Sequence, residues 1–107
     1  MEKVIVYSHE AEEYLKKLIE ILFEKEYFNF RDDAIKYVLS IKNFVHQNIS
    51  YPAKKTPIKY SKYGEKYMFY KANASTTWYI FFNQDEHRFV VKFIANNHTD
   101  FIADFNL

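Results

Sequence analysis

The spacing of apolar residues differs between the first and second halves of this chain of 107 residues, and that difference is its strongest constraint on fold class. Between residues 11 and 45, apolar side chains recur at steps of three and four residues, the period of helices that bury one face. From residue 65 onward the side chains alternate with a period of two, as in strands. A short β-branched run at residues 4–7 precedes the helical part. The pattern predicts an α+β fold with an N-terminal strand, a helical hairpin and then a mainly antiparallel sheet.

Two helices are predicted, and each has a candidate capping residue. Ser8 can cap the first helix, because its hydroxyl can accept a hydrogen bond from a first-turn amide and acidic residues follow it. Either Asn29 or Asp32 can cap the second helix, which must end before Pro52. The two apolar stripes contain Ala11, Tyr14, Leu15, Leu18, Ile19 and Leu22, and then Ala34, Tyr37, Val38, Ile41, Phe44 and Val45.

The second half of the chain is predicted to contain a loop, three strands and a tail. Residues 50–62 hold both prolines and four lysines without periodicity, which predicts a surface loop that ends near Gly64. Strands are predicted at residues 65–71, 76–82 and 88–95. In the last strand, alternation places Phe89, Val91 and Phe93 on one side and Arg88, Val90 and Lys92 on the other. The tail, with Phe101, Ile102 and Phe105, is expected to cover an edge or face of the sheet.

Length and composition indicate one domain over residues 1–107, with enough apolar material for a packed core. The chain contains no cysteine, which excludes disulfides and thiolate metal sites and fits a reducing compartment. Its N-terminus turns acidic early and lacks the apolar segment of a secretory signal. Charges interrupt every apolar run well short of the ~20 residues that cross a bilayer. We therefore expect a cytoplasmic protein that does not enter the membrane.

Several classes of chemistry are excluded by the residues present. A single glycine cannot build the Gly-rich loops that hold nucleotide cofactors, so no cofactor is expected. The four histidines show no metal-binding spacing, so no metal site is expected either. No serine lies in a Gly-x-Ser-x-Gly elbow, and the acidic residues do not pair as in a glycosidase.

The middle of the chain is basic and rich in tyrosine. Residues 1–33 carry nine acids and five bases, whereas residues 50–71 carry six lysines and one glutamate. Lysines can neutralise phosphates, and tyrosines can stack on unpaired bases, so this composition favours nucleic-acid binding. Alternatively, the tyrosines pack in the core and the lysines solvate a loop. The interleaved residues are Lys54, Lys55, Lys59, Lys62, Lys66 and Lys71 with Tyr51, Tyr60, Tyr63, Tyr67 and Tyr70.

Three further side chains are candidates for a reactive or phosphate-binding site. His98 follows the last predicted strand in a polar cluster, where its imidazole could transfer protons near neutral pH. A histidine with a structural hydrogen bond at a strand end is the alternative. Arg88 and Lys92 fall on the same side of their predicted strand and could bind a phosphate together. Equally, both could lie on a solvated sheet face.

The order of predicted elements resembles the RelE/ParE superfamily of toxin–antitoxin toxins over essentially the whole chain. Residues 65–71 look like the first hairpin strand of that family, residues 78–82 like its hydrophobic partner strand, and residues 93–98 like the strand end that often carries catalytic or contact residues. The resemblance implies a two-layer RelE-like fold, in which two helices pack on a twisted sheet. It also implies a cognate antitoxin protein that wraps the toxin.

Members of this family divide into ribosome-dependent endoribonucleases, which cut mRNA at the decoding site, and inhibitors of DNA gyrase. Ribonuclease members typically carry an arginine early in the second hairpin strand, where this chain has Thr76 and Thr77. A comparable site could be rebuilt with Lys71 and Arg88 stabilising phosphate charge, His98 as the general acid or base, and Tyr67 stacking a base. Lys54, Lys55, Lys59, Lys62, Lys66 and Lys92 would then contact nucleic acid.

Three functional hypotheses follow from these observations. The first is an mRNA endoribonuclease toxin. The second is a non-enzymatic protein, either a gyrase inhibitor or a catalytically inactive antitoxin-binding domain, since a shared fold does not select an activity. The third is a basic RNA-binding module unrelated to toxins, which predicts strongly salt-dependent RNA affinity.

Overall fold

The computed structural model describes residues 2–25 and 27–98, and within them the chain forms an α+β fold. The sequence predictions of an N-terminal strand, two helices and a sheet are confirmed. The expected C-terminal covering segment lies outside the described residues. In chain order the elements are β1 (Val4–Tyr7), α1 (His9–Glu24), α2 (Arg31–Asn48), β2 (Lys54–Lys55), the short 3-10 helix η1 (Ile58–Tyr63), β3 (Lys66–Lys71), β4 (Thr77–Asp85) and β5 (Arg88–Asn96).

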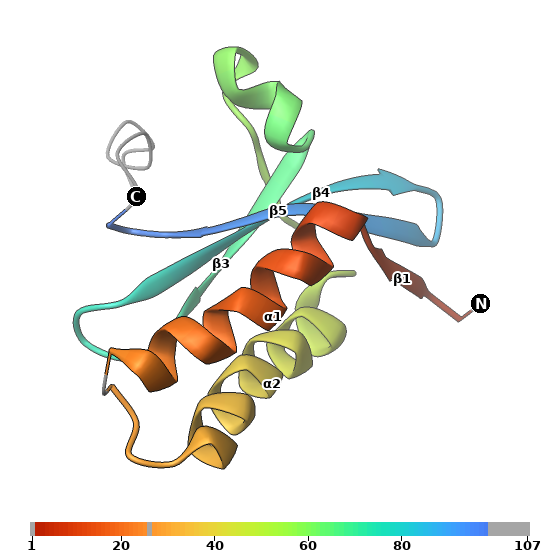
Figure 1. Ribbon diagram of the computed structural model, residues 1–107. Coiled ribbons are helices and arrows are strands. Elements are labelled where there is room, and N and C mark those ends of the chain that lie inside the picture. The colour runs from red at the N-terminus through yellow and green to blue at the C-terminus, as the bar shows by residue number, and fades with distance from the viewer. Residues whose placement is uncertain (1, 26, 99–107) are drawn as a thin grey trace.

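The five strands form one mixed sheet in the order β1-β5-β4-β3-β2. The first strand pairs with the last in parallel, and the other neighbouring pairs are antiparallel. Both α-helices lie side by side on one face of this sheet (Figure 1). Their apolar stripes pack against residues such as Trp78, Ile80 and Phe82, which form the main core. None of the helices in the described part of the chain has the length and apolar character needed to cross a membrane.

The starts of the two helices differ in how they are capped. The hydroxyl of Ser8 accepts a hydrogen bond of 3.1 Å from the backbone N–H of Ala11, as predicted. The second helix begins at Arg31, and its N-cap is Phe30, which makes no side-chain capping bond. The prediction of an Asn29 or Asp32 cap was therefore wrong. Asp32 instead lies in the first turn, where a carboxylate interacts favourably with the helix dipole.

A β-bulge in the last hairpin changes which side chains face the helices. Phe81 pairs with Phe93, but the next residue, Phe82, pairs with Val91, so Lys92 is the extra residue. Val91 consequently packs in the main core under the helices, whereas Phe93 packs on the opposite face of the sheet. The predicted strict alternation that joined Val91 and Phe93 on one side was wrong, because period-two reasoning cannot anticipate an inserted residue.

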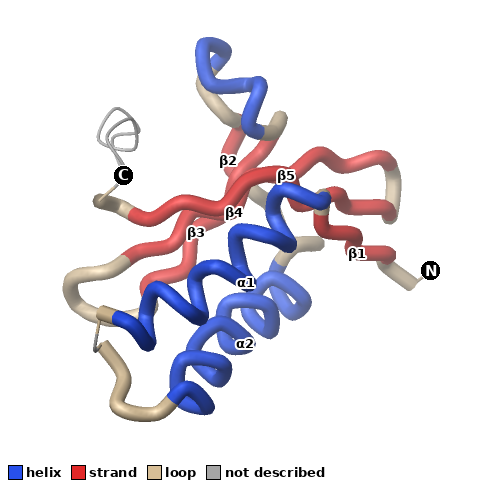
Figure 2. Tube along the Cα trace, viewed as in Figure 1, coloured by secondary structure: helices blue, strands red, loops and turns tan. Residues whose placement is uncertain are grey.

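Residues 50–62 are more regular than the predicted surface loop. They contain β2, which pairs with β3, and most of η1, which stands at the end of the molecule far from the α1–α2 connection (Figure 2). Gly64 follows η1 with a φ of 155°, and a Cβ atom at this position would lie 2.7 Å from the backbone nitrogen of Phe82. Only glycine allows the chain to pass this close to β4 before it enters β3.

Candidate nucleic-acid interface

An aromatic cluster covers part of the sheet face that lies opposite the two α-helices. Phe81 is completely buried at its centre, and its ring lies 5.9 Å from that of Phe93 between centroids. The ring of Tyr63 from η1 packs against this pair in a tilted orientation, with centroid distances of 4.5 Å to Phe93 and 6.1 Å to Phe81. The short helix is therefore held against the sheet by ring packing, which is worth more than the buried area alone. We call Tyr60, Tyr63, Tyr67, Tyr79, Phe81 and Phe93 the aromatic cluster.

Four exposed lysines lie on β2 and η1. Lys59 and Lys62 are exposed on η1, and their ammonium groups lie 5.1 and 5.2 Å from the ring centroids of Tyr60 and Tyr63. Lys54 and Lys55 form the exposed edge strand β2. The sequence from residue 51 to 64 contains no acidic residue. We call Lys54, Lys55, Lys59 and Lys62 the basic corner.

The two predicted nucleic-acid contacts on β3, Tyr67 and Lys66, do not belong to this corner. Tyr67 is only 4% exposed within the aromatic cluster, so its ring is not open to stack on a base. Burial, followed by the neighbouring Tyr79, raises the pKa of the Tyr67 hydroxyl. Lys66 lies on the helix-facing side of β3 and its ammonium group donates a 3.1 Å hydrogen bond to Oε1 of Gln84. Alternation along residues 65–71 places Lys66 and Tyr67 on opposite sides of the strand, but it cannot show that η1 covers one of the two faces.

Arg88 and Lys92 do line one shallow pocket of about 390 Å³, as their predicted common face implies. Glu65 and Asp85 line the same pocket, and Asp85 is the direct cross-strand partner of Arg88. These carboxylates offset the positive charge that a phosphate would need. Lys92 is also the extra residue of the bulge, and its carbonyl oxygen accepts a 3.3 Å hydrogen bond from the hydroxyl of Ser8.

The structure does not bring the three predicted catalytic residues together. Arg88 begins β5 and His98 lies two residues beyond its end, so the strand separates them by roughly 25 Å. Lys71 is at the same end of the sheet as His98, but alternation from the buried Tyr67 places it on the face away from the helices. His98 instead lines a cavity on the helical side, with Tyr37 and Trp78. A single phosphate cannot contact all three, and the predicted composite catalytic site was wrong in this respect.

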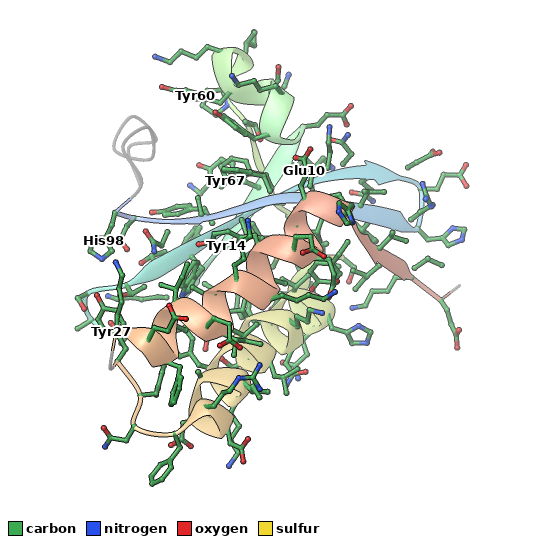
Figure 3. The ribbon with its side chains drawn as sticks, in the orientation of Figure 1. Glu10, Tyr14, Tyr27, Tyr60, Tyr67 and His98 are labelled. Carbon is green, nitrogen blue, oxygen red and sulfur yellow. The ribbon has the colours of Figure 1, made fainter. Side chains whose placement is uncertain are left out.

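The cavity at His98 has a volume of about 550 Å³ and is built by segments far apart in sequence. We call it the His98 cavity. It lies between the end of α1, the α1–α2 connection, the β3–β4 turn and the end of β5. Figure 3 shows His98 and Tyr27 on the same side of the molecule, at the ends of β5 and α1 respectively. Sequence reasoning singled out His98 alone, because no motif spacing links it to Tyr37 or Trp78.

Hydrogen bonds fix two walls of this cavity. The indole Nε1 of Trp78 donates to the hydroxyl of Tyr37 at 2.9 Å, which ties α2 to β4. Asn97 joins the end of β5 to the β3–β4 turn, since its Oδ1 accepts from the N–H of Thr77 and its Nδ2 donates to the carbonyl of Ser75. The backbone N–H of His98 donates to Oδ1 of Asn96 at 2.9 Å. The walls are therefore held by bonds that do not require a ligand.

The described residues provide no cluster of three His, Asp or Glu side chains that could hold a metal ion. Comparison of the chain with models of protein families, with curated proteins and with solved structures finds no match. The functional assignment consequently depends on the chemistry of the basic corner and the His98 cavity.

Proposed function

We propose that this protein is the toxin component of a type II toxin–antitoxin system of the RelE/ParE kind, an endoribonuclease that acts on mRNA bound to the ribosome. The proposal includes a cognate antitoxin protein as its partner. The confirmed element order supports it, because a strand, a helical pair and a mainly antiparallel sheet are what the resemblance implies. The surface chemistry of the basic corner is the observation that carries the proposal.

Four exposed lysines within nine residues, with no acid among them, make a local positive field at one end of the molecule. RNA is a polyanion, and each lysine that neutralises a phosphate releases counterions, which favours binding. If these lysines were on a mobile loop, the entropy cost of ordering the loop on binding would offset much of this favourable free energy. Here η1 is anchored by Tyr63 in the aromatic cluster, so two of the lysines, Lys59 and Lys62, project from a fixed support.

The lysines of the basic corner also have a purely structural explanation, and an experiment must distinguish it from RNA binding. Lysines on an edge strand such as β2 protect the sheet from pairing with another chain, and this role needs no RNA. Lys59 and Lys62 are not on an edge strand, so edge protection does not account for them. Their exposure beside tyrosine rings is what distinguishes a nucleic-acid surface from edge protection alone.

The test is expression of the protein in bacteria, with growth and the 5′ ends of cellular mRNA measured together. We expect growth arrest and new mRNA ends with the natural sequence, and loss of both with the double variant Lys59→Gln and Lys62→Gln. The matched control is Lys16→Gln with Lys17→Gln, which removes two exposed charges from α1. Normal growth and unchanged mRNA ends upon expression of the natural sequence would contradict the proposal.

A second candidate function is favoured by the separation of Arg88, Lys71 and His98. A protein that only binds its target, such as a gyrase inhibitor or an inactive antitoxin partner, needs no assembled catalytic residues. In that case expression would change DNA supercoiling, or have no effect, without producing new mRNA ends. Measuring supercoiling and RNA ends in the same culture separates the candidates.

A further inference from the structure

The His98 cavity combines flat aromatic walls with an excess of hydrogen-bond donors and positive charge. Phe28 and Tyr37 lie in its wall, with ring centroids 5.4 Å apart. Tyr27 is at its mouth and is 69% exposed, which leaves its ring open to a planar partner. A volume of about 550 Å³ lies within the ~300–1,000 Å³ typical of small-molecule sites. These features fit a ligand with one aromatic ring system.

The polar wall is formed by the β3–β4 turn and the end of β5. Oδ1 of Asn73 accepts hydrogen bonds from the backbone N–H groups of Ser75 and Thr76, at 2.9 and 3.0 Å. Oδ1 of Asn96 accepts from His98 in the same way. Both amide oxygens are thus engaged, while neither Nδ2 group has a hydrogen-bond acceptor among the described residues. These two amide groups therefore offer hydrogen-bond donors to a ligand on this wall.

The charge at the cavity has one sign. Lys25 supplies it, His98 adds ring nitrogens that can form hydrogen bonds, and no acidic side chain is among the described lining residues. Lys25 is the C-cap of α1, where the helix dipole favours positive charge. An anionic group is therefore better placed on the strand side, beside His98 and the two asparagine amides. An aromatic ring fits the opposite side, against Tyr27.

We propose that the His98 cavity binds a nucleoside monophosphate unit, with its base against Tyr27 and its phosphate on the strand side near His98, while Lys25 adds positive charge to the cavity as a whole. The unit is either a free nucleotide or one nucleotide of single-stranded RNA. Binding of an RNA nucleotide in this cavity rests on the function proposed above, whereas binding of a free nucleotide does not. Stacking on an exposed tyrosine accepts any base, whereas the donors recognise the phosphate.

Trp78 makes the test direct, because it is the only tryptophan of the chain and it lines this cavity. AMP is titrated into the full chain while tryptophan fluorescence is recorded, with adenosine and ribose 5-phosphate as the two halves of the ligand. We expect saturable quenching by AMP and at least about tenfold weaker binding of each half. No saturable change up to about 10 mM AMP, or equal binding of ribose 5-phosphate, would overturn the proposal.

Exposed positions provide the variants, so that loss of folding does not obscure the result. Tyr27→Ala, Lys25→Gln and His98→Gln should each weaken AMP binding by about threefold to tenfold. The matched control is Lys71→Gln, which removes an exposed charge at the same end of the sheet but on the opposite face, and it should leave binding unchanged. AMP affinity that none of the first three variants alters would place the ligand elsewhere and overturn the proposal.

A short oligoadenylate then distinguishes the two sources of the nucleotide. If Tyr27→Ala weakens oligoadenylate binding, the cavity holds a nucleotide of RNA. If the variant weakens AMP binding alone, the cavity holds a free nucleotide. The Lys59→Gln, Lys62→Gln double variant separates this proposal from the proposed function. It should lose RNA affinity and retain quenching by AMP. AMP quenching in a protein that neither binds RNA nor arrests growth would leave the cavity proposal standing and remove the toxin proposal.

Discussion

The indole N–H of Trp78 donates a 2.9 Å hydrogen bond to the hydroxyl of Tyr37, and this bond joins α2 to β4 beneath the His98 cavity. Trp78 is 2% exposed, so its N–H has no ready access to water. A buried donor that loses its partner costs about 1–3 kcal/mol. The bond thus couples the stability of the two layers to the geometry of the cavity.

Replacing Tyr37 by Phe should lower the free energy of unfolding by about 1–3 kcal/mol, because the indole N–H is left unpaired while the ring packing is retained. Urea unfolding followed by tryptophan fluorescence measures the loss. Tyr51→Phe is the matched control, since Tyr51 is 65% exposed, and its effect should be within about 0.5 kcal/mol. Equal stability of the two variants would show that the bond contributes nothing.

Replacing Gly64 by Ala should destabilise the fold by about 1–3 kcal/mol, because the new Cβ would meet the backbone of Phe82 at 2.7 Å. Backbone atoms cannot move aside as a flexible side chain can. Chemical denaturation gives the change, and Ser61→Ala on the exposed side of η1 serves as the control. A Gly64→Ala protein as stable as the control would mean that the chain at Gly64 does not pass so close to β4.

Replacing Ser8 by Ala should cost about 1–2 kcal/mol, because one hydroxyl both caps α1 through Ala11 and donates to the carbonyl of Lys92 at the bulge. Ser8→Asp keeps an acceptor for the cap but has no hydroxyl for the bulge, so it should recover only part of the loss. Urea denaturation of the three proteins gives the comparison. Full recovery with Asp would show that the contact with the bulge carries no energy.

High pH should destabilise the protein through Tyr7. Burial, and then the carboxylate of Glu12, raise the pKa of the Tyr7 hydroxyl to about 12. Between about pH 10 and 12 the unfolded chain loses this proton while the folded chain keeps it, so the stability present below pH 10 declines as pH rises through this interval. Tyr7→Phe should flatten that decline in urea unfolding, whereas Tyr51→Phe should not. An unchanged slope in Tyr7→Phe would contradict the burial of this hydroxyl.

Most of the fold could be predicted from local patterns, and most of the site could not. The Ser8 cap and the outward position of Lys71 follow from residues close in sequence. The bulge at Lys92 could not be anticipated, because it depends on the pairing of Phe81 with Phe93 across two strands. Tyr67 was mistaken for an exposed ring because the packing of η1 over the sheet is a tertiary contact. His98 and Tyr37 meet in one cavity for the same reason, since 61 residues separate them in the sequence.

If the basic corner binds RNA, the affinity must depend on salt concentration through its lysines. Each lysine that neutralises a phosphate of single-stranded RNA should contribute about 0.7 to the slope of log affinity against log salt concentration. Lys59→Gln with Lys62→Gln should therefore lower the slope for a short single-stranded RNA by about 1.4, while Lys16→Gln with Lys17→Gln leaves it unchanged. Equal slopes for the two double variants would show that the basic corner does not neutralise RNA phosphates.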